Sequence, residues 1–187
     1  MIRIIIFASG SGTNAENIIK YFDKSGFVKV TYVLTNNKNV GIIERAKRLN
    51  IPSKVFSKSE LNSDVFLQFL KKEADFIILA GFLLKIPENL IQVFPKKIVN
   101  IHPALLPNYG GKGMYGMYIH QAVVANKEPK TGITIHYVNK NYDEGAIIFQ
   151  KEVALTENDT PEDVAAKIHQ LEQDNFPKVI KNILLNN

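Results

Sequence analysis

The chain opens on a strand, a glycine turn and a helix, in the stretch Ile2-Arg3-Ile4-Ile5-Ile6-Phe7-Ala8-Ser9-Gly10-Ser11-Gly12-Thr13-Asn14-Ala15. Nearly all of its first six residues are β-branched or aromatic, which is typical of a buried strand. The glycine turn then leads into a helical pattern over residues 14–22. Strand, glycine turn and helix in this order form the first unit of a doubly wound parallel sheet.

The same alternation continues along the chain and decides the predicted fold class. We predict strands at residues 2–7, 28–34, 54–56, 76–79 and 98–101, and helices at residues 14–22, 41–49, 61–72 and 88–94. After a glycine-rich loop at 108–116, we predict a helix at 118–125, strands at 131–138 and 146–153, and a final helix at 161–185. We therefore expect an α/β fold of Rossmann-like type in a single domain, 1–187. Its sheet is mostly parallel and twisted, with helices on both faces and one late antiparallel strand.

Composition narrows the classes of function. The 187 residues include no Cys, which excludes disulfides and thiolate metal sites. The net charge of +5 comes from scattered lysines, and no basic stripe with interleaved aromatic residues points to nucleic acid. A mild positive field suits small anionic substrates. No apolar run approaches the roughly 18 residues of a membrane span, and the first strand is too short for a signal peptide, so we expect a cytoplasmic protein without a membrane partner.

The glycine turn formally matches the dinucleotide pattern G-x-G-x-x-A over residues 10–15. A dinucleotide site also needs an acidic residue near the end of the second strand, to hold a ribose hydroxyl. That place reads Leu34-Thr35-Asn36-Asn37, and no Asp or Glu occurs between Asp23 and Glu44. The turn therefore favours a simpler phosphate or phosphoribosyl site. A tight turn that binds no ligand remains the alternative.

A second motif, Asn100-Ile101-His102-Pro103-Ala104-Leu105-Leu106-Pro107, follows the fifth predicted strand. Asn and His are costly to bury without partners, and ligands of open α/β sheets lie beyond the carboxyl ends of strands. This placement indicates a reaction site. The alternative is a hydrogen-bonded core Asn beside a loop His.

A third motif, Asp143-Glu144-Gly145, joins two late strands, shortly after His136. Asp143 is a candidate acid, although Asp before Gly is also common in turns. His136 has the alternative of a satisfied strand residue. For His120 and His169 we favour a place on polar helix faces, without a functional role.

With Ala80-Gly81-Phe82, these motifs stand in the order and near the spacing of the glycinamide ribonucleotide formyltransferase family, which the chain resembles from Ile2 to about Ile180. The resemblance implies transfer of a formyl group from the co-substrate 10-formyltetrahydrofolate to the amine of glycinamide ribonucleotide. The product would be formylglycinamide ribonucleotide, in de novo purine biosynthesis. It also implies small-molecule partners only, no metal, and a monomer or homodimer.

The resemblance further implies roles for individual residues. His102, as a cation, and the amide of Asn100 would stabilise the oxyanion that develops when the amine attacks the formyl carbon. Asp143 would keep His102 protonated, or accept the amine proton directly or through water. The substrate phosphate would lie at Gly12, Thr13 and Asn14.

Glu172 would contact the substrate ribose, with a surface salt bridge as its alternative role. The residues implied at the folate site are Leu83, Leu84, Lys85, Ile86, Asn100, Asn139, Lys140, Asn141, Tyr142, Asp143 and Lys58. Family members often carry Arg soon after the Gly-Phe pair, whereas this chain has Leu84 there and Lys85 one place later. Lys58 lies near the place of another family Arg.

Three other kinds of protein compete with this interpretation. Methionyl-tRNA and sugar formyltransferases share the Asn-x-His core but normally add further domains, which we do not expect here. Formyltetrahydrofolate hydrolase uses the core with water as acceptor and normally carries an extra amino-terminal domain, also not expected. A non-enzymatic nucleotide-binding module would need the glycine turn but not Asn100, His102 and Asp143 together.

Overall fold

The computed structural model describes residues 1–186, and the chain divides into two compact units, of which the second begins at Ile101. The first unit contains the strands β1 (Ile2–Phe7), β2 (Val28–Thr35), β3 (Ser53–Val55) and β4 (Phe76–Leu79), and it contains most of β5 (Ile98–His102). Its helices are α1 (Thr13–Phe22), α2 (Gly41–Arg48), α3 (Lys58–Leu61), α4 (Asp64–Glu73) and α5 (Glu88–Val93).

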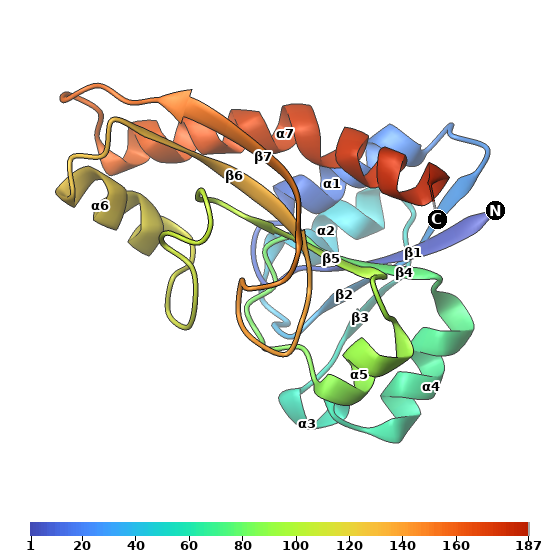
Figure 1. Cartoon of the computed structure of the whole chain (residues 1–187). Coiled ribbons are helices and arrows are strands. Elements are labelled where there is room, and N and C mark those ends of the chain that lie inside the picture. Colours follow the sequence, from blue (N-terminus) through green and yellow to red (C-terminus); the bar gives the residue numbers. More distant parts are fainter. Residues whose placement is uncertain (187) are drawn as a thin grey trace. The chain divides into compact units, whose positions relative to one another are not determined.

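The five strands of the first unit lie in the order β3-β2-β1-β4-β5, and each strand pairs in parallel with its neighbours. Helices α1 and α2 cover one face of this sheet, while α4 and α5 cover the other (Figure 1). Burial on both faces explains why β1 is apolar without alternation: Ile4, Ile5, Ile6 and Phe7 are all fully buried. The ring of Phe7 also packs edge-on against Phe82, which follows β4, with centroids 5.2 Å apart.

The second unit holds the antiparallel pair β6 (Lys130–Tyr137) and β7 (Ile147–Ala154), with α6 (Met117–Ala125) and α7 (Pro161–Leu185). The long helix α7 runs beside β6 and β7 and also packs on α6 (Figure 1). Its start is fixed by a capping box, in which the Thr160 hydroxyl accepts from the Asp163 amide and the Asp163 carboxylate accepts from the Thr160 amide.

The predicted fold class is confirmed: parallel strands with helices on both faces are followed by one antiparallel strand. The predicted helix over 61–72 corresponds to α4, but its predicted start is wrong: α4 begins at Asp64, and Leu61 instead ends the separate helix α3. Ser57 forms a capping box with Glu60, and Ser63 caps α4 by accepting from the Phe66 amide. Two serine caps six residues apart therefore start two helices where apolar periodicity indicates one. The single domain remains a prediction.

Over residues 1–186, no helix combines the length and the apolar character needed to cross a membrane.

Candidate functional site

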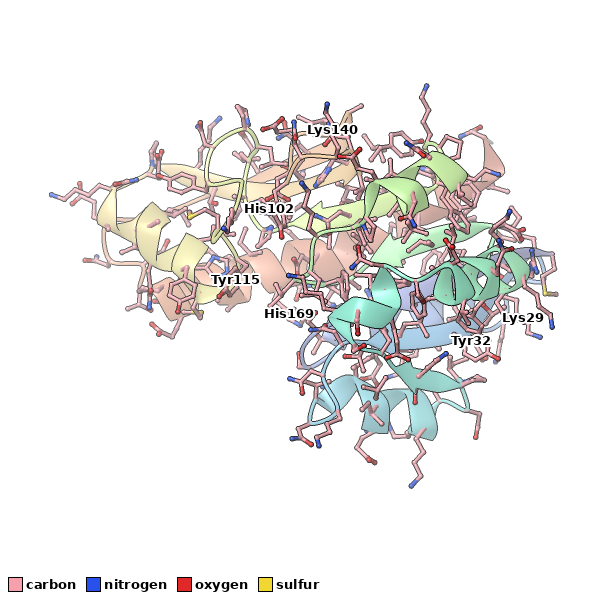
Figure 2. The ribbon with its side chains drawn as sticks, turned by 90° about the horizontal axis from the view of Figure 1, so that it is seen from below. Lys29, Tyr32, His102, Tyr115, Lys140 and His169 are labelled. Atoms are coloured by element: carbon pink, nitrogen blue, oxygen red, sulfur yellow. The ribbon has the colours of Figure 1, made fainter. Side chains whose placement is uncertain are left out.

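Within the second unit, His102 and Asp143 form a buried imidazole–carboxylate pair. His102 ends β5 and is 4% exposed. Its Nδ1 lies 3.5 Å from Oδ1 of Asp143, on the connection between β6 and β7. The backbone N–H of Gly111 donates to the other carboxylate oxygen, Oδ2, at 3.0 Å. Figure 2 labels His102 in the same region as Lys140, which lies on the connection that carries Asp143.

Each ring nitrogen of His102 faces an acceptor. Nε2 donates to the backbone carbonyl of Tyr109 at 2.8 Å, and Nδ1 faces Asp143. A second imidazole completes the cluster, since Nε2 of His136 lies 3.7 Å from Oδ1 of Asp143. Nδ1 of His136 donates to the carbonyl of Tyr137 at 2.9 Å. One carboxylate is therefore shared by two buried imidazoles.

The protonation of this cluster is set by burial as much as by charge. Burial lowers the pKa of His102 below its ordinary value, although the charge of Asp143 and the bond to Tyr109 act in the opposite direction. Burial would raise the pKa of Asp143, but the hydrogen bond from His136, the attraction to each imidazole in its protonated form and the Gly111 N–H lower it overall. Asp143 is thus an anion at neutral pH.

The sequence predicts that Asp143 keeps His102 protonated. The charge of Asp143 does raise the pKa of His102, as predicted, but the overall shift of that pKa is downward. Desolvation is the larger influence, so the neutral imidazole is the favoured resting form. The bond to the Tyr109 carbonyl places the proton of that neutral ring on Nε2.

The loop that follows His102 is fixed by a hydroxyl of β6. The fully buried Thr134 donates through Oγ1 to the carbonyl of Ala104 at 2.7 Å and accepts from the amide of Leu106 at 3.0 Å. Nε2 of Gln150, opposite Thr134 in the β6–β7 pair, donates to the Leu106 carbonyl and to Thr134 Oγ1, both at 2.9 Å. These bonds anchor the segment directly after the candidate imidazole.

Sequence reasoning did not identify four residues that contact this cluster or its loop: Tyr109, Gly111, Thr134 and Gln150. Tyr109 and Gly111 act through backbone groups, for which side-chain patterns give no signal. Thr134 carried a detectable signal, because strand alternation places it on the same face of β6 as His136.

Asn100 lies in the first unit, half-buried on β5, two residues before His102. Because residues two apart in a strand share a face, the side chains of Asn100 and His102 lie on the same face of β5. Asn100 pairs in register with Leu79 of β4.

The glycine turn of the first unit is held by hydrogen bonds of Ser9. Its hydroxyl donates to Oδ1 of Asn36 at 2.6 Å and accepts from the amide of Leu83 at 3.0 Å. Gly12 precedes α1 with φ of 79°, a left-handed conformation that glycine adopts without strain. Thr13 and Asn14 form the first helical residues and are half-buried.

The predicted folate residues lie on both units. In the first, Leu83 is 49% exposed, Leu84 is half-buried, Lys85 is exposed and Ile86 is buried, while Lys58 begins α3 at the surface.

In the second unit, Lys140, Asn141 and Tyr142 are exposed and Asn139 is half-buried. Asn139 Oδ1 accepts from the Asn141 amide at 2.9 Å, which shapes the connection ahead of Asp143.

The remaining candidates lie on helices of the second unit. Glu172 of α7 has a side chain only 13% exposed, with its Oε2 at 3.9 Å from Nδ1 of His169. His169 is nearly half exposed, consistent with a polar helix face. The expectation for His120 is wrong: it is 5% exposed, because it shares the inner face of α6 with the fully buried Val123, and burial lowers its pKa.

Within residues 1–186, no three His, Cys, Asp or Glu side chains are grouped so that they could hold a metal ion. In the second unit, the anionic carboxylate of Asp143 instead lies beside the two imidazoles of His102 and His136. This chemistry suits general acid–base catalysis or stabilisation of a developing negative charge.

Comparison with known proteins gives consistent similarities. Residues 2–180 match the family model described as formyl transferase. The chain is 40% identical to phosphoribosylglycinamide formyltransferase, chloroplastic, of Arabidopsis thaliana, over 95% of this chain and 64% of that protein. It is 35% identical to phosphoribosylglycinamide formyltransferase of Bacillus subtilis (strain 168), over 100% of this chain and 97% of that protein.

Among solved structures, glycinamide ribonucleotide transformylase 1 from Geobacillus kaustophilus superposes with a TM-score of 0.88 at 34% identity, over 98% of this chain and 99% of that one. The chain spans less than two thirds of the length of the Arabidopsis relative. The family model nevertheless covers nearly all of the residues described here. The chain belongs to the formyl transferase family.

Proposed function

We propose that this chain transfers the formyl group of 10-formyltetrahydrofolate to the amine of glycinamide ribonucleotide, giving formylglycinamide ribonucleotide in purine biosynthesis. The observation that carries the proposal is the buried pair of His102 and Asp143, with Nδ1 and Oδ1 at 3.5 Å, in a chain of the formyl transferase family. The names of the relatives support the choice of acceptor. Family membership supports a folate-derived formyl donor.

Asp143 is suited to accept the proton that the amine loses during the transfer. When the amine attacks the formyl carbon, the nitrogen gains positive charge and must lose a proton. Asp143 is the anion of the cluster, so it receives that proton, directly or through water. The same proton passes to the folate nitrogen when its bond to the formyl carbon breaks, which balances the reaction.

His102 and Asn100 are suited to stabilise the negative charge that develops on the formyl oxygen. The formyl oxygen becomes an oxyanion, and each preorganised donor to it is worth about 3–4 kcal/mol. The Nε2–H of His102 now donates to the Tyr109 carbonyl, so it is aimed at an oxygen acceptor that the formyl oxygen would replace. The growing negative charge raises the proton affinity of His102, so Asp143 passes the amine proton on to Nδ1, which lies 3.5 Å from its Oδ1, and as a carboxylate again it stabilises the imidazolium. The Asn100 amide is the second donor.

The substrates would bind as the family resemblance implies. We place the nucleotide phosphate at Gly12, Thr13 and Asn14 and the ribose near Glu172. The pterin would lie among 83–86 and 139–142, with Lys58 toward the folate tail. We also propose that the protein is a monomer or homodimer, that it acts in the cytoplasm, and that its partners are small molecules and not nucleic acid.

The experiment is a coupled assay of the purified chain with both substrates. Deformylated folate is followed by absorbance and formylglycinamide ribonucleotide by mass spectrometry. His102→Ala and Asp143→Asn should each lower turnover at least a hundredfold, while calorimetry shows that glycinamide ribonucleotide still binds. Asp23→Asn, at an exposed position after α1, is the control for loss of one carboxylate and should retain turnover.

Two outcomes would count against the proposal. Near-normal turnover by either His102→Ala or Asp143→Asn would remove the assigned chemistry. Release of formate at the same rate without glycinamide ribonucleotide would instead identify a hydrolase that uses water as acceptor.

A further inference from the structure

Helix α2 lies close to the glycine turn that precedes α1, as one hydrogen bond and two close approaches of the backbone show. The guanidinium of Arg45 donates through Nε to the carbonyl of Ser11 at 2.9 Å. A Cβ placed on Gly12 would lie 2.6 Å from Cβ of Ile42, so the helix leaves no room for a side chain there. A Cβ on Gly41 would lie 3.1 Å from the Ser11 carbonyl oxygen. The turn is therefore shaped by a helix that begins 29 residues after it (41 − 12).

The Arg45 side chain is itself held by a buried carboxylate of α1. Glu16 is 8% exposed and pairs with Arg45, with Arg48 at 2.9 Å and with Lys20 at 2.7 Å. Three cations around one anion leave the cluster with a charge of +2 (3 − 1). Within the described residues 1–186, Arg45 is the one of these three cations that donates a hydrogen bond to the turn. Helices α1 and α2 lie side by side, which brings the groups together (Figure 1).

The bond from Arg45 fixes the direction of a neighbouring donor. The Ser11 carbonyl and the Gly12 N–H belong to one trans peptide unit, in which the two groups point in opposite directions. Holding the carbonyl toward α2 therefore turns the Gly12 N–H away from α2. The proposed function places the substrate phosphate at Gly12, and anions bind to backbone N–H donors such as this one at a helix start.

We infer that Arg45 is a positioning residue for the phosphate of the substrate, acting through the Ser11–Gly12 peptide, and that Glu16 holds Arg45 in place. This inference rests on the proposed function, in which the turn binds the phosphate. Arg45 acts on binding of the phosphorylated substrate and leaves the formyl-transfer step unchanged. Its effect comes from the bond to Ser11, whereas its charge alone is shared with Arg48 and Lys20.

The test compares Arg45→Ala with Arg48→Ala. Both variants lose one positive charge and one partner of Glu16, but only the first loses the contact with the turn. We expect Arg45→Ala to raise KM for glycinamide ribonucleotide about tenfold, the change for roughly 1.4 kcal/mol. Its kcat and its KM for 10-formyltetrahydrofolate should stay within twofold of the wild type. Arg48→Ala should stay within twofold in all three constants.

Arg45→Lys separates geometry from charge and is the milder change if Arg45→Ala folds poorly. Lysine keeps the charge, but its single ammonium cannot reproduce the planar donors that reach both Ser11 and Glu16. We expect its KM for glycinamide ribonucleotide to rise severalfold, and calorimetry with that nucleotide alone to show the same loss of affinity.

Two results would overturn the inference while wild-type formyl transfer remains intact. One is an unchanged nucleotide KM in both Arg45 variants. The other is an equal rise in Arg48→Ala, which would mean that charge alone matters. A wild-type chain that fails to formylate glycinamide ribonucleotide would instead contradict the proposed function.

Discussion

Replacing Thr134 by Val tests whether one buried hydroxyl organises the loop after His102. Valine has nearly the shape of threonine, so the change removes a hydroxyl and leaves the packing volume in place. The buried carbonyl of Ala104 and amide of Leu106 then lose the partner that they have at 2.7 and 3.0 Å. Each unsatisfied buried group costs about 1–3 kcal/mol, so we expect a loss of about 3 kcal/mol in the free energy of unfolding.

The matched control is Thr134→Ser, which keeps the hydroxyl and loses one methyl group, at a cost of about 1 kcal/mol. For a chain of this length, 1 kcal/mol shifts Tm by about 2–4 °C, so Thr134→Val should melt about 6–12 °C below the wild type. Urea titration followed by circular dichroism gives the free energies, and the formyl-transfer assay gives kcat. We expect kcat to fall about tenfold in the valine variant only. If the valine and serine variants have the same stability and the same kcat, the hydroxyl does not organise the loop.

Three further predictions follow from pKa shifts and steric fit. The cation cluster lowers the pKa of Glu16 to about 2, below its ordinary 4.5. The stabilisation that comes from this shift is complete above pH 4.5 and is lost as pH falls toward 2. Over this pH range, urea titration should show the free energy of unfolding falling by about 2 kcal/mol less in Glu16→Gln than in the wild type. The His102 ring, followed by NMR, should titrate below pH 6.5 and lower still in Asp143→Asn, because Asp143 raises that pKa; an upward shift in the variant would contradict the assignment. Gly145→Ala should cost more than about 2 kcal/mol in a thermal melt, since its Cβ would lie 2.7 Å from the carbonyl carbon of Tyr137; an unchanged Tm would show that the connection yields freely.

The parallel part of the fold could be predicted from the sequence because its signals are local. The predicted strands 2–7 and 76–79 coincide with β1 and β4, since four-residue or longer apolar runs bounded by turn residues have few alternatives in this alternating pattern. The start of α7 at Pro161 follows in the same way from Thr160 and the acidic first turn. The sequence also contains the signal that separates α3 from α4, which is a serine cap at the start of each helix. A search for apolar periodicity does not detect such caps.

The candidate site was only partly predictable. His102 and Asp143 carry motifs that the family resemblance identifies, and the structure of the second unit brings these two side chains to 3.5 Å. Tyr109 and Arg45 could not be found in this way. The first acts through its carbonyl, and the second acts through the carbonyl of Ser11, so neither contact depends on a recognisable side-chain motif.

The protonation state of His102 shows most clearly which property of the site could not be predicted from the sequence. A nearby carboxylate predicts a cation, and the sign of that effect is correct. Whether the cation forms depends on how much water the whole fold removes from the ring, and here only 4% of His102 is exposed. A neutral resting imidazole also fits the proposed chemistry better than a permanent cation. It donates Nε2–H to an incoming oxygen at once, and it gains its charge only as the oxyanion forms, so the stabilisation favours the transition state over the bound substrate.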